Sequence, residues 1–187
     1  MTATAPTTRD QILDAFADQL ATVGFAGISL VGVARTAGIQ KPSMYHHFPG
    51  GKEEIYTSVA LRFIDDLGSR VQAAVTTDGD LADRLVALAQ ASAGRTARTI
   101  SFEERIYDAL DHVAQPTRDL VSQRYVDGVL APVTGLFARA VENGEVSGAP
   151  ELLMNAFLHM ARATDLMRTP DDAQRIVDLF LNGARTR

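Results

Sequence analysis

Residues 38–52 read GIQKPSMYHHFPGGK and restrict the local backbone more than any other stretch of the chain. Proline is tolerated in the first turn of a helix, where its missing N–H would have no intrahelical partner. Pro42 therefore marks the start of a short helix, and the glycine pair at 50–51 ends it. Gly38 suits the left-handed turn that closes the preceding helix. This pattern predicts a helix-turn-helix over about 29–48.

The segments before this stretch have the spacing of helices. Thr8 and Gln11 have the form of a capping box, and apolar residues then recur at helical intervals as far as Gly24, which ends the first helix. Ser29 is suited to cap a second helix that ends at Gly38. Three consecutive helices are therefore predicted before the glycine pair.

The third helix has one apolar face and one polar-aromatic face. Met44 and Phe48 lie four positions apart and point inward together, whereas Pro42 and His46 point the opposite way. Such an outer face fits the major groove of DNA, where the N-terminal residues of a recognition helix meet base edges. Lys52 begins the next helix, where backbone N–H groups and a lysine can hold a phosphate.

The charge balance lacks the broad basic field typical of nucleic-acid binders. The net charge is −5, and residues 1–56 carry four basic and five acidic side chains. DNA affinity is therefore predicted to come from local geometry. The absence of cysteine excludes disulfides, thiol nucleophiles and thiolate metal sites. No apolar run approaches about 20 residues and no signal-peptide pattern is present, so we expect a soluble, cytoplasmic protein without a membrane partner.

The runs ILDAFADQLATVGFAGISL and VARTAGIQKPSMYHHFPGGKEEIY resemble the DNA-binding domain of the tetracycline-repressor (TetR) family of bacterial transcriptional regulators. The resemblance covers about a third of the chain, from Thr8 to Leu67. It implies an all-α homodimer with three N-terminal DNA-reading helices and a long fourth helix leading to a variable helical domain. The residues that it carries over as DNA contacts are Ser29, Gln40, Lys41, Pro42, Ser43, Tyr45, His46 and Lys52.

Two positions depart from the family pattern. Gly32 stands in the second helix where a polar helix former is usual, and it costs about 1 kcal/mol of helix stability. Gln40 stands where a serine or threonine cap is common. The fold is expected to tolerate both, but Gln40 is expected to alter which bases are read.

The rest of the chain also has helical spacing, and about nine helices are expected in total. We predict a flexible tail over 1–7, a DNA-binding domain over 8–52 and a helical ligand-binding and dimerisation domain over 53–187. The fourth helix is expected over about 51–76. Pro132 is expected to bend the helix that contains it.

Two amphipathic helices close the chain and are the predicted dimer contact. From the residues alone, their apolar stripes could either close one core or pair with the same helices of a second copy. With the resemblance we expect the dimer, which would place two recognition helices about one DNA turn apart on a pseudo-palindromic operator. The predicted interface residues are Leu153, Ala156, Phe157, Met160, Ile176, Val177, Phe180 and Leu181.

Polar and aromatic residues inside otherwise apolar helices are the candidate lining of a ligand pocket. They are Phe102, Tyr107, Asp111, His112, Tyr125 and His159. Each has an alternative interpretation as an ordinary packing residue, since a lone histidine in a helix is more often structural. The expected effector is a small, largely apolar molecule.

We predict a ligand-responsive repressor whose inducer favours a spacing of recognition helices that no longer fits the operator. The alternatives are a DNA-binding regulator controlled by a partner protein, without a small ligand, and a small helical enzyme. The chain lacks a nucleophile constellation, metal-ligand spacing and a cofactor loop. His112 with Asp108 or Asp111 is only a commonplace helical pair. We therefore expect no enzymatic activity, no cofactor and no metal.

Overall fold

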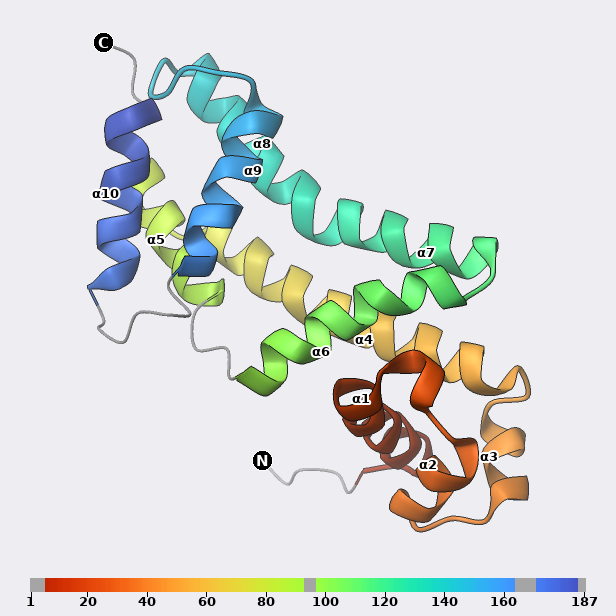
Figure 1. The fold of residues 1–187 in the computed structure, drawn as a ribbon. Helices are drawn as coiled ribbons and strands as arrows, with labels where there is room; N and C mark the ends of the chain where they lie inside the picture. The colour runs from red at the N-terminus through yellow and green to blue at the C-terminus, as the bar shows by residue number, and fades with distance from the viewer. Residues whose placement is uncertain (1–5, 93–96, 164–170, 185–187) are drawn as a thin grey trace. The chain divides into compact units, whose positions relative to one another are not determined.

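The computed structural model describes residues 6–92, 97–163 and 171–184, and every regular element in those ranges is a helix (Figure 1). The helices are α1 (Thr8–Gly27), α2 (Leu30–Thr36), α3 (Lys41–His47), α4 (Gly51–Val75), α5 (Leu81–Ser92), α6 (Ala97–Asp108), η1 (Ala109–His112), α7 (Gln115–Tyr125), η2 (Val126–Leu130), α8 (Ala131–Glu142), α9 (Pro150–Ala161) and α10 (Asp172–Ala184). With α6–η1 and α7–η2–α8 each counted as one segment, the described ranges hold nine helical segments. The predicted all-α fold is therefore confirmed.

The chain packs as two compact units. The first unit consists of Met1–Phe63 and Ala97–Ser122, and the second of Ile64–Thr96 and Gln123–Arg187. These units are defined by packing, whereas the predicted domains are defined by function, so the division at residue 52 stays a prediction. Most of the predicted flexible tail, residues 1–5, lies outside the described residues.

The capping box of α1 lies one residue earlier than predicted. The Thr7 hydroxyl accepts a hydrogen bond from the Asp10 amide at 3.2 Å, and the Asp10 carboxylate accepts one from the Thr7 amide at 3.0 Å. The prediction of Thr8 with Gln11 was wrong because a charged carboxylate is a stronger acceptor than an amide and is favoured near a helix N-terminus. The hydrogen bonds from Thr7 also lower the pKa of the Asp10 carboxyl. Gly24, with φ 68°, interrupts the helix where a break was predicted.

The connection from α2 to α3 follows the prediction closely. The Ser29 hydroxyl accepts a hydrogen bond from the Gly32 amide at 3.4 Å, and Gly38 has φ 69°. Pro42 lies in the first turn of α3. Met44 is fully buried, so the inner face of α3 packs into the core of the first unit.

The first unit is closed where α4 meets α6 and the start of α7. Tyr56 of α4 is fully buried, and its hydroxyl donates to the Ile106 carbonyl at 2.8 Å. Burial raises the pKa of the Tyr56 phenol above its usual value. The Glu53 carboxylate accepts hydrogen bonds from the Ala114 amide at 3.0 Å and the Thr117 hydroxyl at 2.7 Å, which caps the start of α7.

The second unit has an aromatic core supplied by its last three helices. Phe137 of α8, Phe157 of α9 and Phe180 of α10 have ring centroids 5.2 to 6.1 Å apart in pairwise contact. The Ser147 amide also donates to the Ala184 carbonyl at 2.9 Å. Among the described residues, no helix is both long enough and apolar enough to cross a membrane.

A π-helical turn, η2, joins α7 to α8 at the place where the sequence predicts a bend. Pro132 has no N–H, so it cannot donate to the carbonyl of a preceding turn, and the backbone widens over Val126–Leu130. Gly128 lies in this turn and approaches Gly68 of α4 closely. A Cβ at Gly68 would lie 2.9 Å from the Gly128 carbonyl oxygen.

Candidate nucleic-acid interface

The outer face of α3 carries the residues predicted to contact DNA. Met44 and Phe48 are fully buried beneath it, so the helix cannot rotate without exposing them. The residues that remain exposed are Gln40, Lys41, Pro42, Tyr45 and His46, and Ser43 is half-buried. The structure therefore presents one short polar-aromatic surface at α3, and the DNA contacts themselves stay a prediction.

Tyr45 is the largest exposed side chain of α3, with 43% of its surface accessible. The Lys41 ammonium lies 6.0 Å from its ring centroid, which is the outer limit for a cation–π contact. A Cβ at Gly51, the first residue of α4, would lie 3.8 Å from the Tyr45 ring. Glycine at this position, with φ 66°, thus begins α4 beside the ring.

Arg9 fixes the C-terminal end of α3 and was not predicted from the sequence. Its guanidinium donates to the His47 carbonyl at 3.2 Å and to the Ser58 hydroxyl at 3.3 Å, and it lies 4.2 Å above the centroid of the Phe48 ring. A cation at a helix C-terminus is favourable because the last carbonyls are unsatisfied. The 38-residue separation from His47 left no local signal for this contact.

Lys52 lies against the connection between α1 and α2. Its ammonium donates to the Ala26 carbonyl at 3.5 Å and lies 4.6 Å from the centroid of the Phe25 ring. Desolvation lowers the pKa of the Lys52 ammonium below its usual value. Ser29 is exposed three residues after Ala26, so both predicted phosphate contacts lie at this connection.

The six predicted ligand residues do not come together in one cavity. Asp111 and His112 are exposed and line a cavity of about 330 Å³ with Arg105 and Asp108, beside the end of α1. The remaining four are dispersed. Phe102 packs edge-on against Phe63, Tyr107 and Tyr125 are half-buried, and the ring of exposed His159 hydrogen-bonds its own helix at the Asn155 carbonyl.

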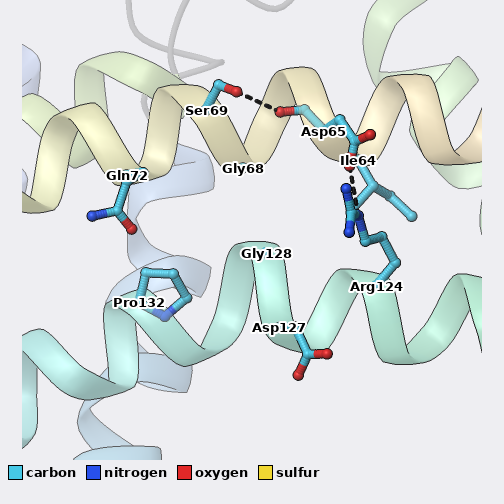
Figure 2. Close-up of a pocket in the computed structure, with 9 residues that line it drawn as sticks. All are labelled: Ile64, Asp65, Gly68, Ser69, Gln72, Arg124, Asp127, Gly128 and Pro132. Atoms are coloured by element: carbon cyan, nitrogen blue, oxygen red, sulfur yellow. Dashed lines mark hydrogen bonds and ion pairs between the residues drawn. The ribbon is translucent and has the colours of Figure 1, made fainter.

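The second unit contains a larger cavity, about 740 Å³, between α4 and the α7–η2–α8 segment (Figure 2). It is lined by Ile64, Asp65, Gly68, Ser69, Gln72, Arg124, Asp127, Gly128 and Pro132. The Arg124 guanidinium donates to the Asp65 carboxylate at 2.6 Å, and this ion pair raises the pKa of Arg124. None of the predicted ligand residues lines this cavity, because helical spacing alone does not reveal which faces of two helices meet.

Most of the predicted dimer residues are instead core residues of a single chain. The six that are buried are Leu153, Phe157, Ile176, Val177, Phe180 and Leu181, whereas Met160 is half-buried and Ala156 is exposed. The burial of these six agrees with the alternative left open by the sequence, in which the two stripes close one core, and the dimer contact itself stays a prediction. The outward faces of α9 and α10 carry other apolar residues, namely Leu152, 66% exposed, and Leu179, 64% exposed.

Together, three elements define a helix-turn-helix DNA-binding domain. They are a capped α2, a glycine turn, and an α3 whose inner face is buried and whose polar outer face is exposed. Residues 12–59 match the family model of the bacterial regulatory proteins of the tetR family. The N-terminal part of the chain is therefore similar to the DNA-binding domain of this family.

A curated relative of this chain is the HTH-type transcriptional activator FasR of Mycolicibacterium smegmatis. It is 30% identical over 118 residues, which make up 63% of this chain and 47% of FasR. The chain thus spans about half the length of that relative. The relationship therefore reaches beyond the helix-turn-helix but does not extend over the whole of FasR.

Solved structures share the fold over nearly the whole chain. A TetR family protein from Vibrio parahaemolyticus has a TM-score of 0.76 and 24% identity, covering 97% of this chain and 100% of that one. AibR, solved in complex with isovaleryl coenzyme A and operator DNA, has a TM-score of 0.70 and 20% identity, covering 95% and 97%. At these identities the likeness shows the fold alone.

Proposed function

We propose that this protein is a sequence-specific DNA-binding transcriptional regulator that represses from a pseudo-palindromic operator. The observation that carries the proposal is the exposed face of α3, which combines donors, acceptors and an aromatic ring above a fully buried Met44 and Phe48. A major groove admits one helix and presents a distinct pattern for each base pair. In this arrangement Gln40, Lys41 and Tyr45 read the groove.

The second part of the proposal is release by a small effector bound in the second unit. The fold is compatible with such control, since AibR was solved with both isovaleryl coenzyme A and operator DNA. The cavity in Figure 2 is the candidate effector site. Its lining includes Asp65, Arg124 and Asp127, which favours an effector with polar groups over the largely apolar molecule expected from the sequence.

The third part of the proposal is a twofold homodimer formed through the outward faces of α9 and α10. Leu152 and Leu179 are two of the most exposed large apolar side chains among the described residues. Covering them would remove apolar surface from water. A twofold dimer would present two α3 helices to the two half-sites of an inverted repeat.

The test is selection of bound duplexes from a random DNA pool at roughly physiological salt. The proposal expects enrichment of one inverted repeat by the native protein and loss of that enrichment for Tyr45→Ala. A folded, dimeric protein that enriches no sequence, even after denaturation and refolding to remove any bound small molecule, would contradict sequence-specific recognition. A reporter placed behind the selected repeat then tests repression: expression must rise when the protein is removed.

A further inference from the structure

Phe25 lies at the centre of a cluster that joins α1, α4 and η1 within the first unit. Its ring meets the Tyr56 ring edge-on, with centroids 5.3 Å apart. The His112 ring stacks near-parallel to it at 6.4 Å, with an interplanar angle of 12°. Tyr56 is itself fully buried and bonded to the Ile106 carbonyl, so half-buried Phe25 packs on one side against a well-anchored ring.

The cation held over this ring is Lys52. The 4.6 Å separation of its ammonium from the ring centroid is well inside cation–π range. The Ala26 carbonyl takes one of the three ammonium donors. Two of its donors are then left for a further partner such as a phosphate.

We propose that Phe25 is a positioning residue for DNA binding, which holds the Lys52 ammonium at the place where a backbone phosphate is bound. The inference rests on the proposed function. Phe25 itself touches no phosphate and acts only through Lys52.

The physical reason is that a lysine is a flexible point charge. Its long stem loses rotamer freedom whenever the ammonium is fixed on a phosphate. A ring and a carbonyl that already hold the charged end remove part of this cost before DNA arrives. The Ser29 hydroxyl, exposed at the same connection, is placed to share the phosphate.

A purely structural role for Phe25 makes a different prediction. If the ring only packs α1 against α4, its loss should weaken DNA binding by the same factor whether or not Lys52 is present. If the ring acts through Lys52, its loss should have no effect once the ammonium has been removed. A double-mutant cycle separates these two cases.

The experiment measures the dissociation constants of the full-length native protein, Phe25→Leu, Lys52→Met and the double variant on the selected inverted repeat, by fluorescence anisotropy at several salt concentrations. We expect Phe25→Leu to weaken binding by about 5- to 25-fold over two half-sites. In the Lys52→Met background we expect the same change to have an effect below about 2-fold, within the usual additivity error. Lys52→Met should reduce the salt slope by about 1 per half-site.

Phe25→Tyr is the matched control, because it keeps the ring beneath the ammonium. It should bind within about 2-fold of the native protein, and it keeps the test valid if Phe25→Leu is poorly folded. Equal losses for Phe25→Leu in the two backgrounds, or a loss for a well-folded Phe25→Tyr as large as that for Phe25→Leu, would overturn the inference.

A second readout does not require DNA. The Lys52 side-chain methylene protons should show an upfield ring-current shift in the NMR spectrum of the free protein, retained in Phe25→Tyr and lost in Phe25→Leu. No such shift would contradict the positioning geometry while leaving the proposed function intact. Failure of the native protein to bind any DNA, with the shift present, would instead reject the proposed function, and the DNA-binding role of Phe25 with it.

Discussion

Three cations of the first unit lie near aromatic rings: Arg9 with Phe48, Lys41 with Tyr45, and Lys52 with Phe25. Residues 1–56 contain only four basic residues, so three of the four have a ring partner at or near α3 and the start of α4. In a domain without a broad basic field, each cation must be positioned accurately, because no neighbouring cation can take over its contact with DNA. For Arg9 and Lys52, which lie 4.2 and 4.6 Å from their ring centroids, the ring provides that placement without neutralising the charge.

Tyr45→Ala is expected to weaken operator binding by roughly 5-fold per half-site, since the side chain is exposed on α3 and one good polar or stacking contact contributes about 1 kcal/mol. The free energy of unfolding should change by less than about 0.5 kcal/mol, as for other exposed positions. Anisotropy titration and thermal unfolding check the two expectations. Tyr45→Phe separates the hydroxyl from the ring. A loss of binding that only accompanies unfolding would contradict a role in DNA contact.

Tyr56→Phe is expected to destabilise the protein by about 1 kcal/mol near neutral pH, because the Ile106 carbonyl loses its donor. Burial raises the pKa of the Tyr56 phenol, whereas the unfolded chain releases this proton near pH 10. The stabilisation is therefore fully present below about pH 10 and declines as the pH rises above it.

Urea unfolding of the native protein and the Tyr56→Phe variant at several pH values measures this effect. The stability difference should be constant up to about pH 9 and should then fall by up to about 1.4 kcal/mol per pH unit. Subtracting the stability of the variant from that of the native protein cancels the pH-dependent contributions of the other tyrosines and of the lysines. If the native protein became still more stable than the variant above pH 10, the pKa of Tyr56 would not be raised by folding.

At the scale of elements, α4 and η2 approach each other through two glycines, Gly68 and Gly128. The π-turn carries Gly128 to the α4 surface, and the absence of a Cβ at Gly68 permits the backbone contact. Such turns often occur at functional positions. Here both glycines also line the cavity in Figure 2, so the crossing forms part of the wall of the candidate effector site.

Gly68→Ala is expected to destabilise the second unit by about 1–3 kcal/mol, because the added methyl group would lie 2.9 Å from the Gly128 carbonyl oxygen and the helices must separate. Gly183→Ala in α10 is the matched control. Its Cβ would meet nothing within 4 Å, so it should stabilise the protein by about 0.5–1 kcal/mol through helix propensity. Chemical denaturation followed by circular dichroism measures both. Equal effects of the two substitutions would show that the crossing is not tightly packed.

At the scale of the whole molecule, the proposed function requires a second copy of the chain. The aromatic core of Phe137, Phe157 and Phe180 is completed within one chain, so the dimer is not needed to bury it. The residues left for an interface are those on the outward faces of α9 and α10. Dimerisation is therefore expected to be separable from folding.

Leu152→Glu combined with Leu179→Glu is expected to yield a folded monomer that binds the inverted repeat at least about 10-fold more weakly, because two charges would be buried unpaired in the interface. Leu120→Glu is the matched control, since Leu120 is 50% exposed on α7 and lies on neither closing helix. Sedimentation measures the oligomeric state, and DNA titration measures the affinity for the inverted repeat. A dimeric double variant with native affinity would place the interface elsewhere.

The sequence alone was sufficient wherever the constraint is local. Gly38, Pro42 and Ser29 fix turn and cap geometry through their own backbone preferences, and Met44 with Phe48 defines the inner face of α3 by spacing. The long α4 followed from one sustained apolar stripe. These features depend on neighbours within a few positions, which a linear pattern contains.

Only the tertiary structure decided which faces and charges meet. It assigned the stripe of Phe157 and Phe180 to a single-chain core, although the same stripe would suit a dimer. It also brought Arg9 to the end of α3 and Lys52 to Phe25, contacts across 38 and 27 positions. Periodicity determines that a helix has an apolar side, but the partner of that side depends on how distant segments pack. The physical reason is that the hydrophobic effect is non-directional, so contact with any apolar neighbour is favourable.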